Sequence, residues 1–133
     1  MKKEQPMIQL YKHYSMLDQA WDYPDFTPKE VSCKHCGELY YDDVAMSKLQ
    51  GLRDMWGKPM VITSGHRCKV HNKNVGGVSS SQHLQIAFDC VVPKAEQDKF
   101  VLMAQRCGFT GIGFYPDKGF VHIDTGPART WKG

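Results

Sequence analysis

Two segments of the chain place histidine and aspartate side chains among apolar residues of the kind that form β-strands. Residues 81–89 read Ser-Gln-His-Leu-Gln-Ile-Ala-Phe-Asp, and residues 120–126 read Phe-Val-His-Ile-Asp-Thr-Gly. Burying an unpaired charge or donor in such surroundings is costly, so another group has to compensate it. A divalent metal ion would do so, because neutral imidazole nitrogens and an ionised carboxylate are ligands that suit zinc. The two segments therefore predict a metal site to which both contribute.

The candidate metal ligands are His83, Asp89 and His122. Three protein ligands leave one coordination position open for water, which is the arrangement of catalytic zinc sites. The alternative for His83 or His122 taken alone is a hydrogen-bonded histidine of the core.

Asp124 lies two residues after His122, and the two-residue period of a strand puts Phe120, His122 and Asp124 on one face. Asp124 is therefore available either to orient an imidazole or to act as a base near a metal-bound water. Asp117 competes for the second role. The candidate catalytic residues are thus Asp124 and Asp117, together with Arg67, which lies where the predicted strand at 59–63 enters a loop and could present a cation to a substrate.

Five motifs occur in order along the chain. They are Ser-Gly-x-Arg at 64–67, Asn-x-x-Val-Gly-Gly at 72–77, Ser-x-His at 81–83, Ala-x-Asp at 87–89 and Val-His-x-Asp-Thr-Gly at 121–126. In order and spacing they resemble the zinc peptidases of the D-Ala-D-Ala carboxypeptidase and peptidoglycan endopeptidase family, whose metal site is shared with the hedgehog signalling domain. The resemblance extends from about Phe26 to Trp131. It implies an α+β fold with an antiparallel sheet flanked by helices.

The same resemblance implies a function. The chain would be a zinc-dependent peptidase that cleaves peptide bonds of peptidoglycan involving a D-amino acid, as a carboxypeptidase or an endopeptidase, with Zn²⁺ on His83, Asp89 and His122. Arg67 would bind a substrate carboxylate or the developing oxyanion, a role in which a well-placed donor contributes about 3–4 kcal/mol. The alternative for Arg67 is a structural role, in which it ties down the loop that follows it.

The sequence departs from the family pattern between His83 and Asp89. The family usually reads Ser-x-His-x-x-Gly-x-Ala-x-Asp, whereas this chain is one residue shorter and lacks the glycine. Because side chains alternate between the faces of a strand, a shift of one residue can turn Asp89 away from His83. Either the loop absorbs the shortening, or a residue is missing from the sequence, or the metal site is damaged.

A second departure is Gly119, at a position where carboxypeptidases of the family often have an acid. The general base is therefore not carried over. Together the two departures keep open another class of function, a non-catalytic module that retains the fold and binds peptidoglycan peptide or a protein partner.

The length of 133 residues fits a single domain with one core. We divide it into an N-terminal arm without a clear period, residues 1–25, and a zinc metallopeptidase domain, residues 26–133. Capping residues, apolar period and turn residues predict the elements of that domain. They are helices from Thr27 to Cys33, at 42–57 and at 93–106, strands at 59–63, 86–92, 109–115 and 119–124, and an ordered loop at 66–82.

Charge and hydropathy limit the partners. The 17 basic and 14 acidic side chains give a net charge of +3 without the clustered basic stripe of a nucleic-acid-binding protein. No run approaches the roughly 18 apolar residues of a membrane span, and the first six residues are not followed by the apolar stretch of a signal peptide. We expect a monomer made in the cytoplasm that reaches the cell wall by another route, such as phage lysis or packaging in a virion.

The five cysteines, at positions 33, 36, 68, 90 and 107, are an odd number for a disulfide framework, and we expect them to be reduced. Cys33 and Cys36 form a Cys-x-x-Cys pair, which supplies two of the four ligands of a structural zinc site. Cys68, Cys90 or Cys107 could complete it only if the fold brings them close. The alternative is a tight turn with free thiols.

Overall fold

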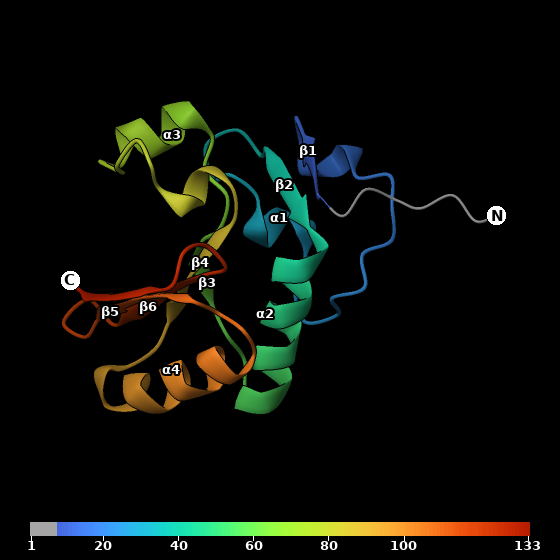
Figure 1. Cartoon of the computed structure of the whole chain (residues 1–133). Helices are drawn as coiled ribbons and strands as arrows, with labels where there is room; N and C mark the ends of the chain where they lie inside the picture. Colours follow the sequence, from blue (N-terminus) through green and yellow to red (C-terminus); the bar gives the residue numbers. More distant parts are fainter. Residues whose placement is uncertain (1–7) are drawn as a thin grey trace.

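The computed structural model describes residues 8–133, and residues 1–7, the start of the predicted arm, lie outside the described part. The helical segments are η1 Tyr14–Met16, α1 Pro28–Val31, α2 Asp43–Trp56, α3 Lys69–Asn74, η2 Gln82–Leu84, η3 Lys94–Glu96 and α4 Gln97–Arg106 (Figure 1). The strands are β1 Ile8–Tyr11, β2 Leu39–Asp42, β3 Ile62–Ser64, β4 Ala87–Val91, β5 Gly111–Tyr115, β6 Phe120–Asp124 and β7 Arg129–Lys132. The predicted α+β class is confirmed.

The larger sheet has the strand order β3-β4-β6-β5-β7. Its neighbouring strands are antiparallel except β5 and β7, which run parallel. The prediction of an antiparallel sheet is therefore correct for four strands, while β7 was not predicted and makes the sheet mixed. Asp89 on β4 and Gly113 on β5 both lie opposite His122 on the central strand β6. This register brings the two segments of the predicted metal site side by side.

Alternation along β4 and β6 separates a core face from a polar face. The core face joins a buried apolar cluster that also includes residues of α2 and α4, among them Phe88, Val121, Ile123, Leu49 and Phe100. Figure 1 shows α4 on one side of this sheet and α3 on the other. The second face is thereby left to the polar side chains of Asp89 and His122.

The predicted helices form where their end signals lie. α1 begins with a capping box between Thr27 and Glu30. α2 begins after Asp42, whose side chain accepts a backbone hydrogen bond from the first turn, and ends at Gly57 with φ +76°. Glycine adopts this left-handed conformation without steric cost, which is why it ends the helix here. The helix predicted at 93–106 is present as η3 followed by α4.

The predicted N-terminal arm is irregular over most of its described part but includes one strand and one 3-10 turn that were not predicted. β1 pairs antiparallel with β2, and Tyr11 and Tyr23 are 5% and 3% exposed within the core. The strand has no sequence pattern of buried apolar and exposed polar residues. Only Tyr11 is buried, while the apolar residues Ile8 and Leu10 are exposed. The division between an arm and a metallopeptidase domain remains a prediction.

The loop predicted at 66–82 contains a short helix, α3, which begins after Cys68. Its six residues are mostly polar, so they carry no apolar period that would have predicted it. Among residues 8–133, no helix has both the length and the apolar character needed to cross a membrane.

Candidate metal centre

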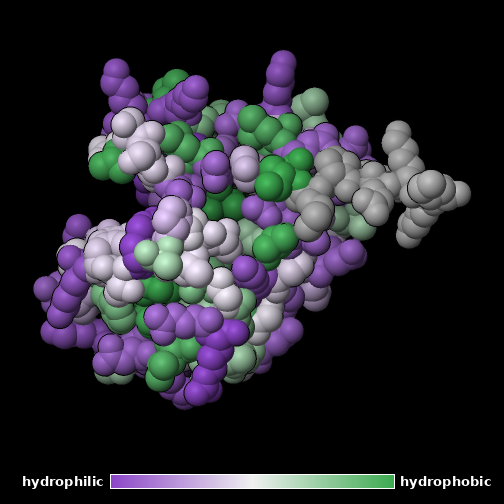
Figure 2. All heavy atoms as spheres, viewed as in Figure 1, coloured by the Kyte–Doolittle hydropathy of each residue, from purple (hydrophilic) through white to green (hydrophobic). Residues whose placement is uncertain are grey.

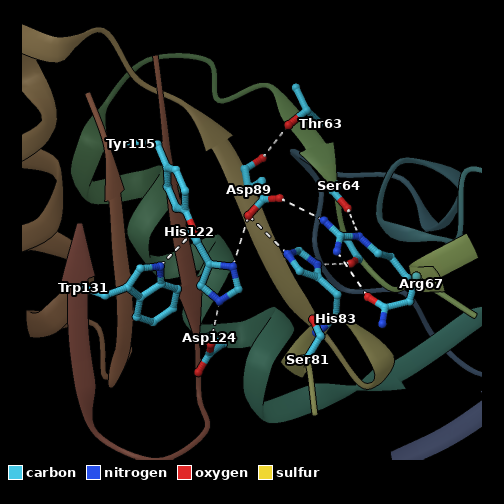
Figure 3. A network of polar contacts seen from close by, with 12 residues as sticks. Thr63, Ser64, Arg67, Ser81, His83, Asp89, Tyr115, His122, Asp124 and Trp131 are labelled. Carbon is cyan, nitrogen blue, oxygen red and sulfur yellow. Dashed lines mark hydrogen bonds and ion pairs between the residues drawn. The ribbon is translucent and has the colours of Figure 1, made fainter. Parts of the chain in front are cut away.

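The three predicted metal ligands meet on the polar face of the larger sheet. The Oδ1 atom of Asp89 lies 3.2 Å from His83 Nε2 and 3.1 Å from His122 Nδ1. All three donor atoms lie within 4.8 Å of one another, and all three residues are buried. Figure 3 shows Asp89 between the two imidazoles, with His83 on the η2 segment and the other two on paired strands. We call this group the metal centre.

The hydrogen bonds behind the two imidazoles determine which nitrogens face Asp89 as acceptors. His83 Nδ1 lies 2.6 Å from the Gly65 carbonyl oxygen, which can only accept, so this nitrogen carries the proton. His122 Nε2 lies 2.6 Å from a carboxylate oxygen of Asp124 and donates to it. His83 Nε2 and His122 Nδ1 therefore both direct a lone pair toward the Asp89 carboxylate, which is itself an acceptor. Three buried acceptors without a cation between them are unfavourable, so the donor set fits a divalent metal.

The shortened loop does not turn Asp89 away from the metal centre. The three residues of η2 are followed by Gln85, whose backbone adopts φ −109° and ψ −107°, and β4 begins at Ala87. Asp89 then pairs with His122 in the ladder between β4 and β6. Of the alternatives left by the sequence, the structure shows the one in which the loop absorbs the missing residue.

Asp124 lies behind His122 and is held by donors on several sides. Its side chain is fully buried, and Arg129 binds both carboxylate oxygens, at 3.0 and 2.8 Å. The Gly126 N–H donates to the same carboxylate at 2.9 Å. Although burial raises the pKa of Asp124, the hydrogen bonds from His122, Arg129 and Gly126 outweigh it and hold the pKa well below its usual range. The geometry therefore matches a carboxylate that orients an imidazole.

Two glycines of β5 make room for the side chains behind and beside His122. A Cβ at Gly111 would collide with the Asp124 carboxylate and the Arg129 guanidinium. A Cβ at Gly113 would lie 2.5 Å from the indole of Trp131, whose ring centroid is 5.0 Å from that of His122. The alternation of glycines in Gly-Ile-Gly at 111–113 is therefore a consequence of the side chains that cross this strand.

Sequence reasoning missed Arg129 and Trp131 because β7 was not predicted. Arg129 lies with its guanidinium 4.9 Å from the Trp131 ring, and the Trp131 indole N–H donates to the Tyr115 hydroxyl at 2.8 Å. The available signal was the pattern Gly-Pro-x-Arg-x-Trp directly after the site strand, together with the two glycines on β5.

Arg67 reaches the metal centre from the end of β3. Its Nε donates to Ser64 Oγ at 3.1 Å, one terminal nitrogen donates to Asn72 Oδ1 at 3.3 Å, and the other lies 3.5 Å from Asp89 Oδ2. Its backbone N–H also donates to the His83 carbonyl at 2.6 Å. The guanidinium is thus held in one orientation next to the candidate ligands.

A cavity of about 610 Å³ opens over the metal centre. Its lining includes Arg67, Asp89 and His122 of the metal centre and its surroundings. The rest of the lining comes from residues 75–78 and 80–83 and from Tyr115, Lys118, Phe120, Arg129 and Trp131. Figure 2 shows a notch at the left of the molecule, between the part that carries α3 and the part that carries the sheet. The candidate ligands are therefore buried but accessible from one side.

Asp117 is not brought to this cavity. It lies in the turn between β5 and β6 with a side chain that is 90% exposed, and it forms an ion pair with Lys94 at 3.7 Å. It lines a separate, smaller pocket. Lys118 of the same turn lines the large cavity, whereas Asp117 does not, so the catalytic role of Asp117 stays a prediction without support from its position. Among the described residues, Asp89 is the only carboxylate in the lining of the large cavity.

Charges within the metal centre reinforce one another. Burial raises the pKa of Asp89, but hydrogen bonds and charge interactions with His122 and His83 outweigh it and hold this pKa well below its usual range. Burial lowers the pKa of His122, but Asp124 and Asp89 outweigh it and raise this pKa above its ordinary value. The two carboxylates that favour positive charge on His122 would equally favour a cation beside it.

The chain is similar to known peptidases over most of its length. The family model described as Peptidase M15 matches residues 24–124. The peptidoglycan L,D-endopeptidase MepK of Escherichia coli K12 is 33% identical over 92 residues, which cover 63% of this chain and 49% of that protein. The zinc D-Ala-D-Ala carboxypeptidase of Streptomyces albus G is 35% identical over 97 residues, which cover 67% of this chain and 37% of that protein. The chain thus spans about half or less of the length of these curated relatives.

Proposed function

The chain belongs to the peptidase M15 family, and from that premise we propose that it is a zinc-dependent peptidase that cleaves a peptide bond of peptidoglycan next to a D-amino acid. The zinc ion would be held by His83, Asp89 and His122. One observation carries the proposal: three buried acceptor atoms converge within 4.8 Å at the base of an open cavity. Three protein ligands leave a coordination position for the reaction, as in catalytic zinc sites.

What zinc supplies in such a site is Lewis acidity and a water ionised near neutral pH. The residues around the metal centre orient its two imidazole ligands. Asp124, fixed by Arg129, keeps the Nε2 proton of His122 in place and so presents Nδ1 as the ligand atom. The Gly65 carbonyl does the same for His83 from the opposite side.

We assign the binding of a substrate carboxylate or of the developing oxyanion to Arg67. Its guanidinium lies beside Asp89 and is already oriented by Ser64 and Asn72, so little reorganisation is needed when substrate binds. The remaining walls of the cavity combine the aromatic rings of Tyr115, Phe120 and Trp131 with the serines and glycines of residues 76–82. The small residues leave room for an extended peptide of short side chains, and the aromatic rings offer it an apolar surface.

Three observations favour the alternative function, a non-catalytic module that binds peptidoglycan peptide. The position of the family acid is Gly119, Asp117 points elsewhere, and among the described residues only Asp89 contributes a carboxylate to the cavity. A module of this kind would bind peptidoglycan through the same cavity without cleaving it.

The test is cleavage of purified peptidoglycan by the full chain supplied with zinc. New amino groups and the masses of the released fragments would show whether a bond is broken and which one, which also separates carboxypeptidase from endopeptidase activity. His83→Ala serves as the inactive variant, and Asp117→Asn serves as a matched control outside the cavity. We expect release by the wild type and by Asp117→Asn, and none by His83→Ala. Binding of peptidoglycan by zinc-loaded wild type without new amino groups would overturn the proposal in favour of the module.

A further inference from the structure

Three of the five cysteines lie together, away from the cavity. The Sγ atoms of Cys33, Cys36 and Cys68 are within 4.8 Å of one another. Cys90 is buried in the core, Cys107 lies after α4, and all five thiols are free. Of the three cysteines that the sequence left open as partners of the Cys-x-x-Cys pair, the fold selects Cys68.

The turn that carries Cys33 and Cys36 is closed by the backbone. The Gly37 N–H donates to the Cys33 carbonyl at 2.8 Å, and the Cys33 N–H donates to the Glu38 carbonyl at 2.8 Å. Gly37 adopts φ +79°, a conformation that is strained for residues with a Cβ. The turn therefore places both cysteines before any ion binds.

Backbone N–H groups point at two of the three sulfurs. The Cys68 N–H donates to Cys33 Sγ at 3.4 Å, and the His71 N–H donates to Cys68 Sγ at 3.4 Å. Such donors favour a thiolate over a thiol, because hydrogen bonds to a charged acceptor are stronger. Three thiolates this close would repel one another without a cation, and sulfur ligands in tetrahedral sites are typical of zinc.

A structural zinc site needs a fourth ligand, and two imidazoles are close to the cysteines in the chain. The rings of His35 and His71 are nearly parallel, with centroids 6.0 Å apart. His71 is partly buried and its backbone already bonds to Cys68, whereas His35 is exposed in the turn. Neither imidazole belongs to the group of ligand atoms that the three sulfurs form, so either ring would have to turn to reach an ion there. The partial burial of His71 and its backbone bond to Cys68 favour His71.

We propose a structural zinc ion on four ligands, which we name the thiol site: Cys33, Cys36, Cys68 and His71. With four protein ligands no position is left for water or substrate, so the role of this ion is to join segments of the chain. It would tie the turn before β2 to the start of α3. Because Arg67 directly precedes Cys68, the ion would also fix the backbone of Arg67. The value of this for substrate binding rests on the proposed function.

The test uses the full chain with His83→Ala, which removes a ligand of the metal centre. We expect about one zinc ion per chain by elemental analysis after gel filtration, because structural sites of this type bind zinc tightly. Cobalt(II) in place of zinc should give near-ultraviolet absorption from thiolate-to-metal charge transfer. Adding Cys36→Ser, at an exposed position, should remove this absorption, and Cys107→Ser, outside the cluster, should not.

The fourth ligand is tested with a second pair of variants. His71→Ala should lower zinc affinity in the same background by more than about 100-fold, beyond the 10–100-fold typical of outer-shell partners, and His35→Ala should leave it unchanged. A larger loss in His35→Ala would overturn the assignment of His71.

Three results would overturn the thiol site itself: a metal-free His83→Ala protein, an absorption that survives Cys36→Ser, or a mass two hydrogens lower that shows a disulfide between these cysteines. These readouts do not involve cleavage of peptidoglycan. A failure of the proposed function would therefore leave them unchanged.

Discussion

The metal centre and the thiol site are built from different kinds of structure. Two ligands of the metal centre come from paired strands inside a sheet, and all three are buried. The cysteines of the thiol site come from a turn and from the residue before α3, and only Cys33 is buried while Cys36 is exposed. The metal centre opens into a cavity of about 610 Å³, and none of these cysteines lines it.

The difference matches what each ion would have to do. A site that keeps an open position needs ligands held by their surroundings, which here are Asp124 behind His122 and the Gly65 carbonyl behind His83. A closed site can take its ligands from segments that are less rigid, since the ion itself completes the arrangement. The two sites should therefore respond independently to mutation.

The largest expected effect is on the metal centre. His122→Ala removes a ligand and should reduce peptidoglycan cleavage by on the order of 10³-fold or more, since the Lewis acid contributes several kcal/mol. The zinc content should fall by about one ion per chain, while the cobalt absorption of the thiol site remains. Elemental analysis and the cobalt spectrum of one preparation check both. Full retention of zinc by His122→Ala and by His83→Ala would exclude the metal centre.

Arg67 contacts the metal centre through Asp89 and directly precedes Cys68 of the thiol site. Arg67→Lys tests whether its side chain acts on the substrate without affecting either ion. A lysine cannot replace a planar fork that contacts Ser64, Asn72 and Asp89 at once, so kcat should fall by about 10²–10³-fold. Zinc content at both sites should not change. Steady-state cleavage of a soluble wall peptide is the measurement, and unchanged turnover would return Arg67 to a structural role.

The metal centre was largely predictable from the sequence because two of its three ligands, Asp89 and His122, lie on strands. The two-residue period of residues 120–124 puts His122 and Asp124 on one face of the strand. The register between β4 and β6 then places Asp89 opposite His122. The position of Asp89 after the shortened loop was left open by the sequence, because nothing in residues 84–86 shows how a loop tightens.

The parts that could not be predicted depend on contacts distant in sequence. β7 is a parallel edge strand of four residues, of which Arg129, Thr130 and Lys132 are exposed, so it has no apolar period. Its pairing with β5 depends on Gly113, which accepts the Trp131 ring beside it. The choice of Cys68 over the other cysteines likewise depends on where the fold places α3.

A moderate effect is expected when the support of His122 is weakened. Asp124→Asn removes a buried carboxylate and should lower zinc affinity at the metal centre by about 10–100-fold, leaving the thiol site unchanged. Asp117→Asn, which alters an exposed aspartate, is the control. Zinc competition titrations followed separately in the Cys36→Ser and His83→Ala backgrounds would assign any loss to one site.

The same variant has a pH signature. The pKa of His122 lies above its ordinary value of 6.5, so its charged form stabilises the metal-free protein at low pH, and this contribution is lost as pH rises through the raised pKa. Zinc must displace that proton, so affinity should fall as pH drops below the raised pKa. Asp124→Asn should shift this fall to lower pH. Calorimetry in buffers of different ionisation enthalpy measures the protons released, and an unshifted profile would contradict the role given to Asp124.

The smallest effect is expected from restoring the missing residue. Gln85 is anchored on both sides, since its N–H donates to the Gln82 carbonyl at 2.9 Å and its carbonyl lies 2.5 Å from His66 Nδ1. Asp89 is fixed by the ladder with β6 rather than by the loop. A glycine inserted between Gln85 and Ile86 should therefore change closure entropy by only tenths of a kcal/mol, and zinc affinity by less than about threefold. If the insertion instead tightened zinc binding by about 10–100-fold, the natural loop would be holding Asp89 off the metal. Because the anchors on Gln85 and the pairing of Asp89 are independent of each other, an unchanged affinity would show that the strand register, and not the loop, keeps the carboxylate in the metal centre.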